Sequence, residues 1–188
     1  MPNIGVFFDR DDTLNYDPGY LGNPDKVELI PGVAEGLKKL KKQLNCKIIV
    51  ISNQSGIARG LITENDVHSV NNKLNELTGN LIDGFYFCPF HPEFDPPEKS
   101  NCRKPSPEMI HQAAREHKID LGVSYLVGDV ITDMLCGANA GVKTILFNWK
   151  NSVGIINGLK KQGKTPNLVV HNFIDACNFI IEDLSGGN

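Results

Sequence analysis

Runs of apolar, β-branched residues alternate along this chain with segments whose apolar residues recur at helical spacing, and this alternation limits the possible folds most. Residues 47–52 contain the continuous run IIVI, which is typical of a strand buried on both faces. Residues 33–44 instead repeat an apolar residue every three or four positions, with lysines between them. The alternation predicts an α/β fold, a Rossmann-like three-layer sandwich with a mostly parallel sheet.

The same periodicity gives the remaining elements. Strands are expected at residues 4–8, 47–52, 85–88, 125–127 and 142–147. Helices are expected at 33–44, from Thr63 onward, from Ser106-Pro107 onward, at 131–140 and at 173–184. Asp66 forms a variant of the capping box with Thr63, and Ser106 suits the N-cap of its helix. No internal repeat or low-complexity linker divides the 188 residues, so one domain spanning 1–188 is expected.

Composition and the N-terminal sequence exclude several classes of protein. Nineteen basic and twenty-two acidic side chains give a formal net charge of −3, so nucleic acid is not the expected partner. The apolar run IGVFF is too short for a signal-peptide core or a membrane span, so we expect a cytoplasmic protein without a membrane partner. Five scattered cysteines without a CxxC motif are expected to be reduced thiols, with one possible exception in the loop from Cys88 to Cys102, which is considered for zinc below.

Charged and hydroxyl side chains gather where the predicted strands end. The residues concerned are Asp9 and Asp11 after the first strand, Ser52 at the end of the second, Arg103 and Lys104 before a helix, and Asp129 and Asp133 in a GDVITD motif. Because ligands of open parallel sheets bind beyond the carboxyl ends of the strands, these side chains should converge on one crevice.

The donor types in this set indicate what the crevice binds. Two carboxylates as close as Asp9 and Asp11 repel each other unless a cation or a proton lies between them. Several acidic oxygens without a histidine or cysteine cluster favour a hard cation, and Mg²⁺ is the expected one. A lysine, an arginine, a serine hydroxyl and helix N-terminal amides favour a phosphate beside that cation.

These motifs resemble those of the haloacid dehalogenase (HAD) superfamily of phosphohydrolases. Its DxDx[TV] strand end, Ser or Thr, Lys and GDxxxD sequence correspond here to DRDDT at 9–13, Ser52, Lys104 and residues 128–133. The heptose 1,7-bisphosphate phosphatases and the related histidinol-phosphatases form a branch that resembles this chain more closely. The matching segments are DRDDTLN, DPGY at 17–20, SNQSGIARG at 52–60, CPFHP at 88–92, CRKPSPEM at 102–109 and VGDVITDM at 127–134. The GIARG run favours the heptose branch, and the resemblance implies a HAD-like core without a large cap domain.

The resemblance also implies a mechanism. Asp9 is expected to attack phosphorus and form an aspartyl-phosphate, while Asp11 acts first as an acid and then as a base. Mg²⁺ would be held by the Asp9 carboxylate, the Asp11 backbone carbonyl and Asp129. Asp133 would orient these ligands rather than bind the metal.

The family implies further residues that contact the phosphate and the rest of the substrate. Ser52, Arg103 and Lys104 would grip the phosphoryl oxygens during transfer, and Arg103 could hold a second phosphate. The implied substrate-binding residues are Asp17, Pro18, Gly19, Tyr20, Asn53, Gln54, Ser55, Arg103 and Lys104.

Two substitutions depart from the family pattern near this crevice. Asp12 stands where the family has glycine, and it either caps a turn facing away or faces the crevice and repels a second phosphate. Val130 stands where the family has lysine, which removes one expected contact with the substrate.

A third departure concerns zinc. The branch binds structural Zn²⁺ with Cys-x-His and Cys-x-Cys, whereas the corresponding residues here are Cys88, Phe90, Ser100 and Cys102. A closed tetrahedral site needs four ligands, and only Cys88, His91 and Cys102 remain as candidates. We therefore expect less than one Zn²⁺ per chain.

The function expected from these features is Mg²⁺-dependent hydrolysis of a phosphomonoester, with one phosphate removed from D-glycero-D-manno-heptose 1,7-bisphosphate. This reaction would belong to the carbohydrate metabolism of lipopolysaccharide precursors. Histidinol phosphate or another small sugar phosphate is the alternative substrate, and a receiver-like or other non-catalytic phosphate-binding module is the alternative class. Placement of the Asp9–Asp11 pair at the end of the first strand favours the enzyme. The expected partner is a small phosphorylated metabolite, and the expected oligomeric state is a monomer.

Overall fold

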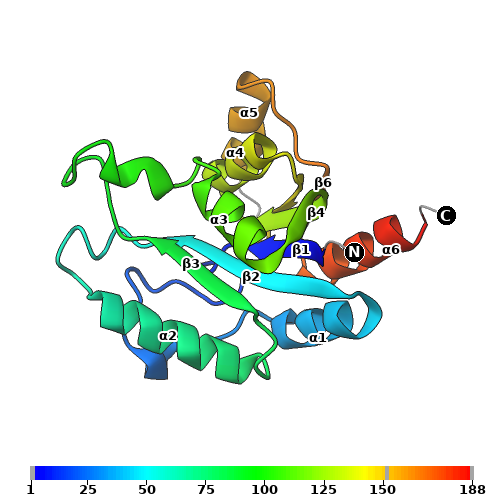
Figure 1. The fold of residues 1–188 in the computed structure, drawn as a ribbon, viewed down its shortest axis with the longest axis horizontal. Coiled ribbons are helices and arrows are strands. Elements are labelled where there is room, and N and C mark those ends of the chain that lie inside the picture. The colour runs from blue at the N-terminus through cyan, green and yellow to red at the C-terminus, as the bar shows by residue number, and fades with distance from the viewer. Residues whose placement is uncertain (1–2, 151–152, 187–188) are drawn as a thin grey trace.

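The structure, a computed structural model, describes residues 3–150 and 153–186, and within them six strands form one parallel sheet (Figure 1). The strands are β1 (Asn3–Phe8), β2 (Cys46–Asn53), β3 (Gly84–Cys88), β4 (Ile119–Gly128), β5 (Lys143–Phe147) and β6 (Leu168–Val170). Their order is β3-β2-β1-β4-β5-β6, and every neighbouring pair is parallel. The predicted α/β class and parallel sheet are therefore confirmed.

Helices cover both faces of the sheet, as Figure 1 shows. The helices are α1 (Val33–Gln43), α2 (Glu64–Leu77), α3 (Glu108–His117), α4 (Ile131–Ala140), α5 (Val153–Lys161) and α6 (Phe173–Ser185), with short 3₁₀ turns η1 (Pro24–Lys26) and η2 (Lys99–Cys102). Val6 and Phe8 of β1 pack in one buried cluster with α1, α2 and α6, while Phe7 packs in a second cluster with α3 and α4. Alternate residues of one strand thus face opposite layers, which gives the expected three-layer sandwich.

Local signals explain where several helices begin and end. The predicted capping box at α2 is present, because Asp66 N donates to Thr63 Oγ1 (3.2 Å) and Thr63 N donates to Asp66 Oδ2 (2.7 Å). Gly141 ends α4 in the left-handed region (φ 78°), as its position predicted. The predicted N-cap at Ser106 is one residue too early, because α3 begins at Glu108 and has Pro107 at its N-cap. Ser106 Oγ still accepts a hydrogen bond from Glu108 N (3.4 Å).

Two elements near the C-terminus were not predicted. Between Phe147 and Phe173 the structure contains α5 and β6. Helix α5 carries Gly154 and Gly158, which weaken a helical pattern, and β6 has only three residues. Neither segment is long or periodic enough to be recognised from sequence alone. No helix in the described part of the chain has both the length and the apolar character needed to cross a bilayer.

The expectation of five reduced cysteines is wrong for one pair. Cys88 at the end of β3 and Cys102 at the end of η2 form a disulfide, with their Cα atoms 5.5 Å apart. This Cα separation is typical of disulfide pairs, and it arises because the loop after β3 returns beside that strand. Cys46, Cys136 and Cys177 are free and buried, as expected of small core residues.

Candidate active site

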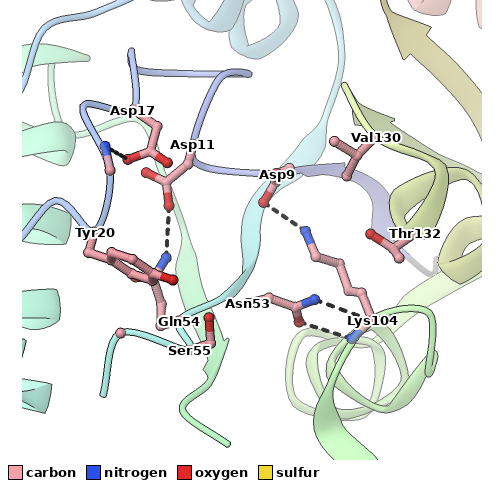
Figure 2. Close-up of a pocket in the computed structure, with 12 residues that line it drawn as sticks. Asp9, Asp11, Asp17, Tyr20, Asn53, Gln54, Ser55, Lys104, Val130 and Thr132 are labelled. Atoms are coloured by element: carbon pink, nitrogen blue, oxygen red, sulfur yellow. Dashed lines mark hydrogen bonds and ion pairs between the residues drawn. The ribbon is translucent and has the colours of Figure 1, made fainter. Parts of the chain in front are cut away.

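A cavity of about 310 Å³ opens at the carboxyl edge of the sheet, where β1, β2 and β4 end (Figure 2). Its lining residues are Asp9, Asp11, Asp17, Gly19, Tyr20, Asn53, Gln54, Ser55, Gly56, Lys104, Val130 and Thr132. The predicted convergence of the strand-end motifs on one crevice therefore holds for both carboxylates of the first motif and for the lysine.

Some residues singled out from the sequence lie behind or beside this cavity. Ser52 is buried, and its Oγ accepts a hydrogen bond from Gln54 Nε2 (3.2 Å). Pro18 lines a neighbouring cavity of about 390 Å³, which shares Gly19 and Tyr20 with the first. Ser52 therefore supports the side chain of Gln54 in the free structure instead of facing the cavity.

The ammonium of Lys104 forms ion pairs with two of the acidic groups of the site. Its Nζ lies 2.7 Å from Oδ1 of Asp9 and 2.6 Å from Oδ1 of Asp133, and it donates to the Ile51 carbonyl (3.1 Å). Asn53 fixes the backbone of Lys104, because its amide donates to the Lys104 carbonyl (3.2 Å) and accepts from Lys104 N (2.9 Å). Burial acts to lower the pKa of Lys104, but the charges of Asp133 and Asp9 raise it above its usual value, so the ammonium stays charged.

Asp9 lies at the centre of this charged cluster. Burial raises the pKa of Asp9 well above its usual value, Lys104 opposes the rise, and the charges of Asp133, Asp129 and Asp11 add to it. Burial, together with the charges of Asp133 and Asp12, raises the pKa of Asp129 to about 7. Because these carboxylates lie close together and repel one another, they favour the binding of a cation beside them.

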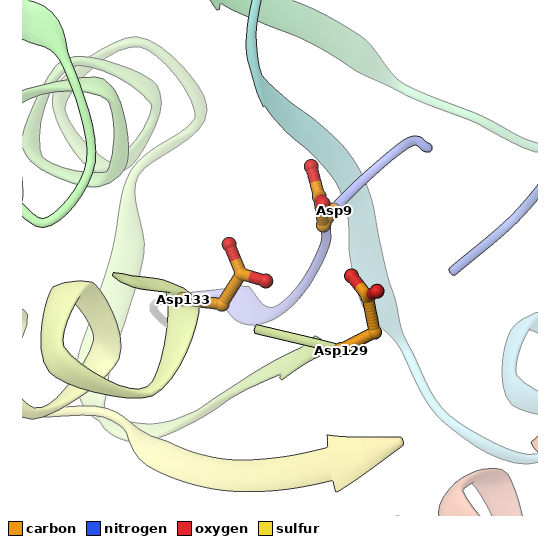
Figure 3. A group of neighbouring side chains, drawn as sticks. All are labelled: Asp9, Asp129 and Asp133. Atoms are coloured by element: carbon orange, nitrogen blue, oxygen red, sulfur yellow. The ribbon is translucent and has the colours of Figure 1, made fainter. Parts of the chain in front are cut away.

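The carboxylates form a group that fits a metal ion. Asp9, Asp129 and Asp133 each offer an oxygen, and these oxygens lie within 4.8 Å of one another (Figure 3). A donor set made only of oxygen suits a hard cation such as Mg²⁺. Thr13 Oγ1 donates to Asp129 Oδ1 (3.4 Å), which helps to orient that carboxylate.

Asp133 differs from the other two acids because both its oxygens already have partners. Oδ1 pairs with Lys104, and Oδ2 accepts a hydrogen bond from Val130 N (3.2 Å). Gly128 makes room for this carboxylate, since a Cβ at that position would lie 2.5 Å from Asp133 atoms. This arrangement favours Asp133 as a group that positions Lys104 and the metal ligands.

Asp11 is held by four hydrogen bonds from three side chains. Arg10 donates from Nε to Oδ1 (3.1 Å) and from Nη2 to Oδ2 (3.0 Å), Gln54 Nε2 donates to Oδ2 (2.9 Å), and Asn15 Nδ2 donates to Oδ1 (3.1 Å). Burial acts to raise the pKa of Asp11, but the charge of Arg10 and these hydrogen bonds together lower it. In the free structure Asp11 is therefore an ionised carboxylate beside Asp9.

Arg10, which lowers the pKa of Asp11, was not among the site residues predicted from the sequence. It is fully buried, and its Nη1 donates to Asn71 Oδ1 of α2 (3.1 Å). The available signal was a charged residue between Asp9 and Asp11 where a strand enters the core, because a buried arginine requires paired acceptors.

The structure decides between the two orientations considered for the Asp12 side chain, away from the crevice or into it. Asp12 has a left-handed backbone (φ 57°), forms an ion pair with Lys150, and accepts a hydrogen bond at its carbonyl from Trp149 Nε1 (2.8 Å). It lines a different cavity of about 220 Å³, with Asp129 and Lys150, and not the cavity that Asp9 lines. The reading in which Asp12 faces away is confirmed, and its positive φ explains the glycine of the family pattern.

The residues considered for zinc are arranged differently from a metal site. Cys88 and Cys102 bond to each other, so neither sulfur is a thiolate. His91 Nδ1 accepts a hydrogen bond from Glu93 N (3.2 Å), and His91 N donates to Asp95 Oδ2 (2.9 Å). In this arrangement the disulfide closes the loop after β3.

Comparisons with known proteins agree with this geometry. The HAD-hydrolase-like family model matches residues 101–176. The chain is 36% identical over 186 residues to the D-glycero-beta-D-manno-heptose-1,7-bisphosphate 7-phosphatase of Haemophilus ducreyi, covering 96% of this chain and 100% of that protein. It is 42% identical over 181 residues to the enzyme of the same name from Helicobacter pylori, covering 94% of each.

A solved structure has the same fold. The D,D-heptose 1,7-bisphosphate phosphatase from B. bronchiseptica, complexed with magnesium and phosphate, superposes with a TM-score of 0.80 at 24% identity. The match covers 96% of this chain and 99% of that one. The likeness therefore extends over the whole sheet and both helical layers.

Proposed function

The chain belongs to the HAD-like hydrolases, in the branch of the heptose-1,7-bisphosphate 7-phosphatases, and from this premise we propose that it removes one phosphate from D-glycero-D-manno-heptose 1,7-bisphosphate. It is a HAD-type phosphatase, a phosphoric monoester hydrolase. The observation that carries the proposal is the position of Asp9, which lines the cavity between Lys104 and two further carboxylates.

We propose that Asp9 is the nucleophile. One of its oxygens attacks phosphorus while the bond from phosphorus to the sugar oxygen breaks, and the leaving oxygen takes a proton from Asp11. A water molecule then gives a proton to Asp11 and attacks the phosphorus of the aspartyl-phosphate, which releases inorganic phosphate and restores Asp9. Both carboxylates line the same cavity, as these two steps require.

Asp11 must carry a proton for the first step and none for the second. Arg10 and its hydrogen bonds hold the pKa of Asp11 below its usual range in the free structure, which suits the second step. The negative charge of an entering phosphate acts in the opposite direction and favours the protonated acid needed for the first step.

The metal proposed for this site is Mg²⁺. The Asp9 carboxylate, the Asp11 backbone carbonyl and Asp129 would hold it, and Asp133 would orient them. When bound, Mg²⁺ supplies charge that neutralises the phosphoryl oxygens. Lys104 adds an ammonium on the side of Asp133, so it can stabilise the same oxygens during transfer.

The substrate class follows from the shape and the polar lining of the cavity. The cavity is sugar-sized, and Asp17, Asn53 and Ser55 offer it acceptors and donors for hydroxyl groups. Tyr20 is an exposed aromatic side chain on its wall. A small phosphorylated sugar fits this lining.

We further propose that residues 1–188 act as one domain, that the enzyme works as a cytoplasmic monomer, and that it holds less than one Zn²⁺ per chain. The disulfide between Cys88 and Cys102 supports the last statement, because both sulfurs are occupied.

The test is a substrate panel assayed with Mg²⁺. Heptose 1,7-bisphosphate, the matching monophosphates, histidinol phosphate and an aryl phosphate are compared by phosphate release, for the wild type and for Asp9→Asn. We expect the bisphosphate to have the highest specificity constant and Asp9→Asn to hydrolyse none of them. A higher specificity constant for histidinol phosphate would replace the proposed substrate.

A further inference from the structure

Asn71 is a polar residue on the apolar face of α2. The buried residues of this helix recur at helical spacing along one stripe: Val67, Val70, Asn71 and Leu74. Asn71 is only 4% exposed, and a buried amide costs stability unless its polar atoms are hydrogen-bonded. Its Oδ1 accepts a hydrogen bond from Nη1 of Arg10 (3.1 Å). The core face of α2 therefore supplies an acceptor to a residue that follows β1.

The guanidinium of Arg10 links this amide to the Asp11 carboxylate. Its Nε donates to Asp11 Oδ1 (3.1 Å) and its Nη2 donates to Asp11 Oδ2 (3.0 Å), so it contacts both oxygens at once. The side chain is fully buried, and the Arg10 carbonyl accepts a hydrogen bond from Leu14 N (2.8 Å). Because Nη1 is bound to Asn71, the guanidinium is held from two sides. The orientation of the Asp11 carboxylate thus depends on α2.

The hydrogen bonds to Asp11 also show which of its oxygens can reach a substrate. Oδ1 accepts from Arg10 and Asn15, neither of which lines the cavity, whereas Oδ2 accepts from Arg10 and from Gln54, which does (Figure 2). Two donors occupy both lone pairs of Oδ2, so a leaving oxygen that meets it takes the place of Gln54 Nε2. That amide already has a second acceptor in Ser52 Oγ (3.2 Å). After the exchange, Arg10 still holds Oδ2 in place.

We propose that Asn71 and Arg10 are positioning residues that hold Oδ2 of Asp11 at the leaving oxygen of the substrate. From this place Asp11 gives its proton to the leaving oxygen in the first step and takes one from water in the second. The inference rests on the proposed function, because it assumes that Asp11 is the acid and the base. Neither Arg10 nor Asn71 lines the cavity, so they act on the reaction through Asp11.

The test is Asn71→Leu, which suits the apolar face of α2 and removes the acceptor of Arg10. Rapid mixing with substrate and Mg²⁺, followed by an acid quench, measures how fast Asp9 is phosphorylated and how fast the aspartyl-phosphate is hydrolysed. With heptose 1,7-bisphosphate, phosphorylation should slow by about ten- to a hundredfold, because an alkoxide leaving group needs the proton of Asp11. With 4-nitrophenyl phosphate, whose leaving group departs without a proton, phosphorylation should hardly change. Hydrolysis should slow with both, so phosphorylated enzyme accumulates with the aryl phosphate.

Asn72→Leu is the matched control, because Asn72 is the next residue of the same helix and is exposed. It should phosphorylate Asp9 at the wild-type rate from both substrates, and a loss as selective as that of Asn71→Leu would overturn the inference. Arg10→Lys keeps the positive charge without the planar fork, so it should show the same difference between the two substrates. Since Arg10 is fully buried and its replacement can prevent folding, the result for Asn71→Leu decides.

The ratio of the two phosphorylation rates separates positioning from a merely structural role. If Asn71 only stabilised the fold, Asn71→Leu would change both rates by the same factor, and that result, or two unchanged rates, would overturn the inference while the proposed function stands. If the wild type phosphorylates Asp9 from neither substrate, the proposed mechanism is wrong and the inference falls with it. If it uses the aryl phosphate but not the heptose, only the proposed substrate is wrong, and the comparison is made with the sugar phosphate that it hydrolyses fastest.

Discussion

Nζ of Lys104 lies 2.7 Å from Oδ1 of Asp9, and both side chains are buried where β1 meets the loop before α3. The contact joins two segments separated by 95 positions in the chain. Burial raises the pKa of Asp9 well above its usual value, and the Lys104 ammonium opposes that rise. Lys104 is therefore the neighbour that favours the ionised form of Asp9, which is the form that can attack phosphorus.

Lys104→Met should leave Asp9 and Asp133 buried without their cation. We expect turnover of an aryl phosphate to fall by at least about a hundredfold. The free energy of unfolding of the metal-free protein should drop by about 3–5 kcal/mol. Chemical denaturation and phosphate release measure the two effects. Lys150→Met, which removes a partly exposed lysine paired with Asp12, is the control. Full turnover in Lys104→Met would contradict the role given to this contact.

Asp129 gives a pH dependence of stability in the metal-free protein. Its folded pKa of about 7 lies above its usual value of 3.8, so its stabilising contribution is complete below about pH 4 and is lost as the pH rises to 7. The loss amounts to at most about 4 kcal/mol. In chelator, Asp129→Asn should therefore unfold at a higher temperature than the wild type at pH 8, and this difference should shrink toward pH 4.

The same pair of proteins tests the metal site. Added Mg²⁺ should raise the unfolding temperature of the wild type at pH 8 and leave that of Asp129→Asn almost unchanged. If Mg²⁺ stabilised both proteins equally, Asp129 would not be a ligand.

The sheet and most helices could be predicted from the sequence because their signals are local. The run IIVI in β2 and the capping box of Thr63 with Asp66 are readable without knowledge of their neighbours. Helix α5 and strand β6 depend instead on packing. Leu159 of α5 is buried against Met134 and Leu146, and tertiary contacts of this kind compensate for two glycines.

Some parts of the candidate site could likewise be predicted from local sequence, and others could not. Asp9 and Asp11 could be placed at one edge of the sheet because parallel strands end together there. The partners that set their charge could not be predicted, since Arg10 also contacts Asn71, 61 positions away, and Lys104 contacts Asp9 from 95 positions away. The pairing of Cys88 with Cys102 likewise depends on the return path of a loop.

Val130→Lys tests the second departure from the family pattern. Val130 is 40% exposed and lines the cavity with Asp9, so a lysine there can reach the distal end of a substrate. One added charge-assisted contact should strengthen binding of a bisphosphate by about 1–3 kcal/mol. The ratio of specificity constants for heptose 1,7-bisphosphate and its monophosphates should rise accordingly. An unchanged ratio would mean that position 130 does not contact the distal phosphate.

Asp12→Gly should have little effect on either stability or substrate choice. Glycine suits the positive φ, which offsets the loss of a partly exposed ion pair with Lys150, so the free energy of unfolding should change by less than about 1 kcal/mol. The preference for the bisphosphate should stay the same, because Asp12 does not line the cavity with Asp9. A marked gain in that preference would show that the Asp12 charge reaches the substrate.

The central claim is that Asp9 carries the phosphoryl group during turnover, and trapping that intermediate tests it most directly. Asp11→Asn lacks the base for the second step and also the acid for the first, so the trap uses an aryl phosphate, whose leaving group departs without a proton. Mixed with this variant and Mg²⁺ and quenched in acid, it should leave one phosphoryl group on the peptide containing Asp9. Peptide mass spectrometry locates the group, and Asp9→Asn treated in the same way should carry none. A phosphoryl group on another residue, or turnover by Asp9→Asn at the wild-type rate, would contradict the mechanism.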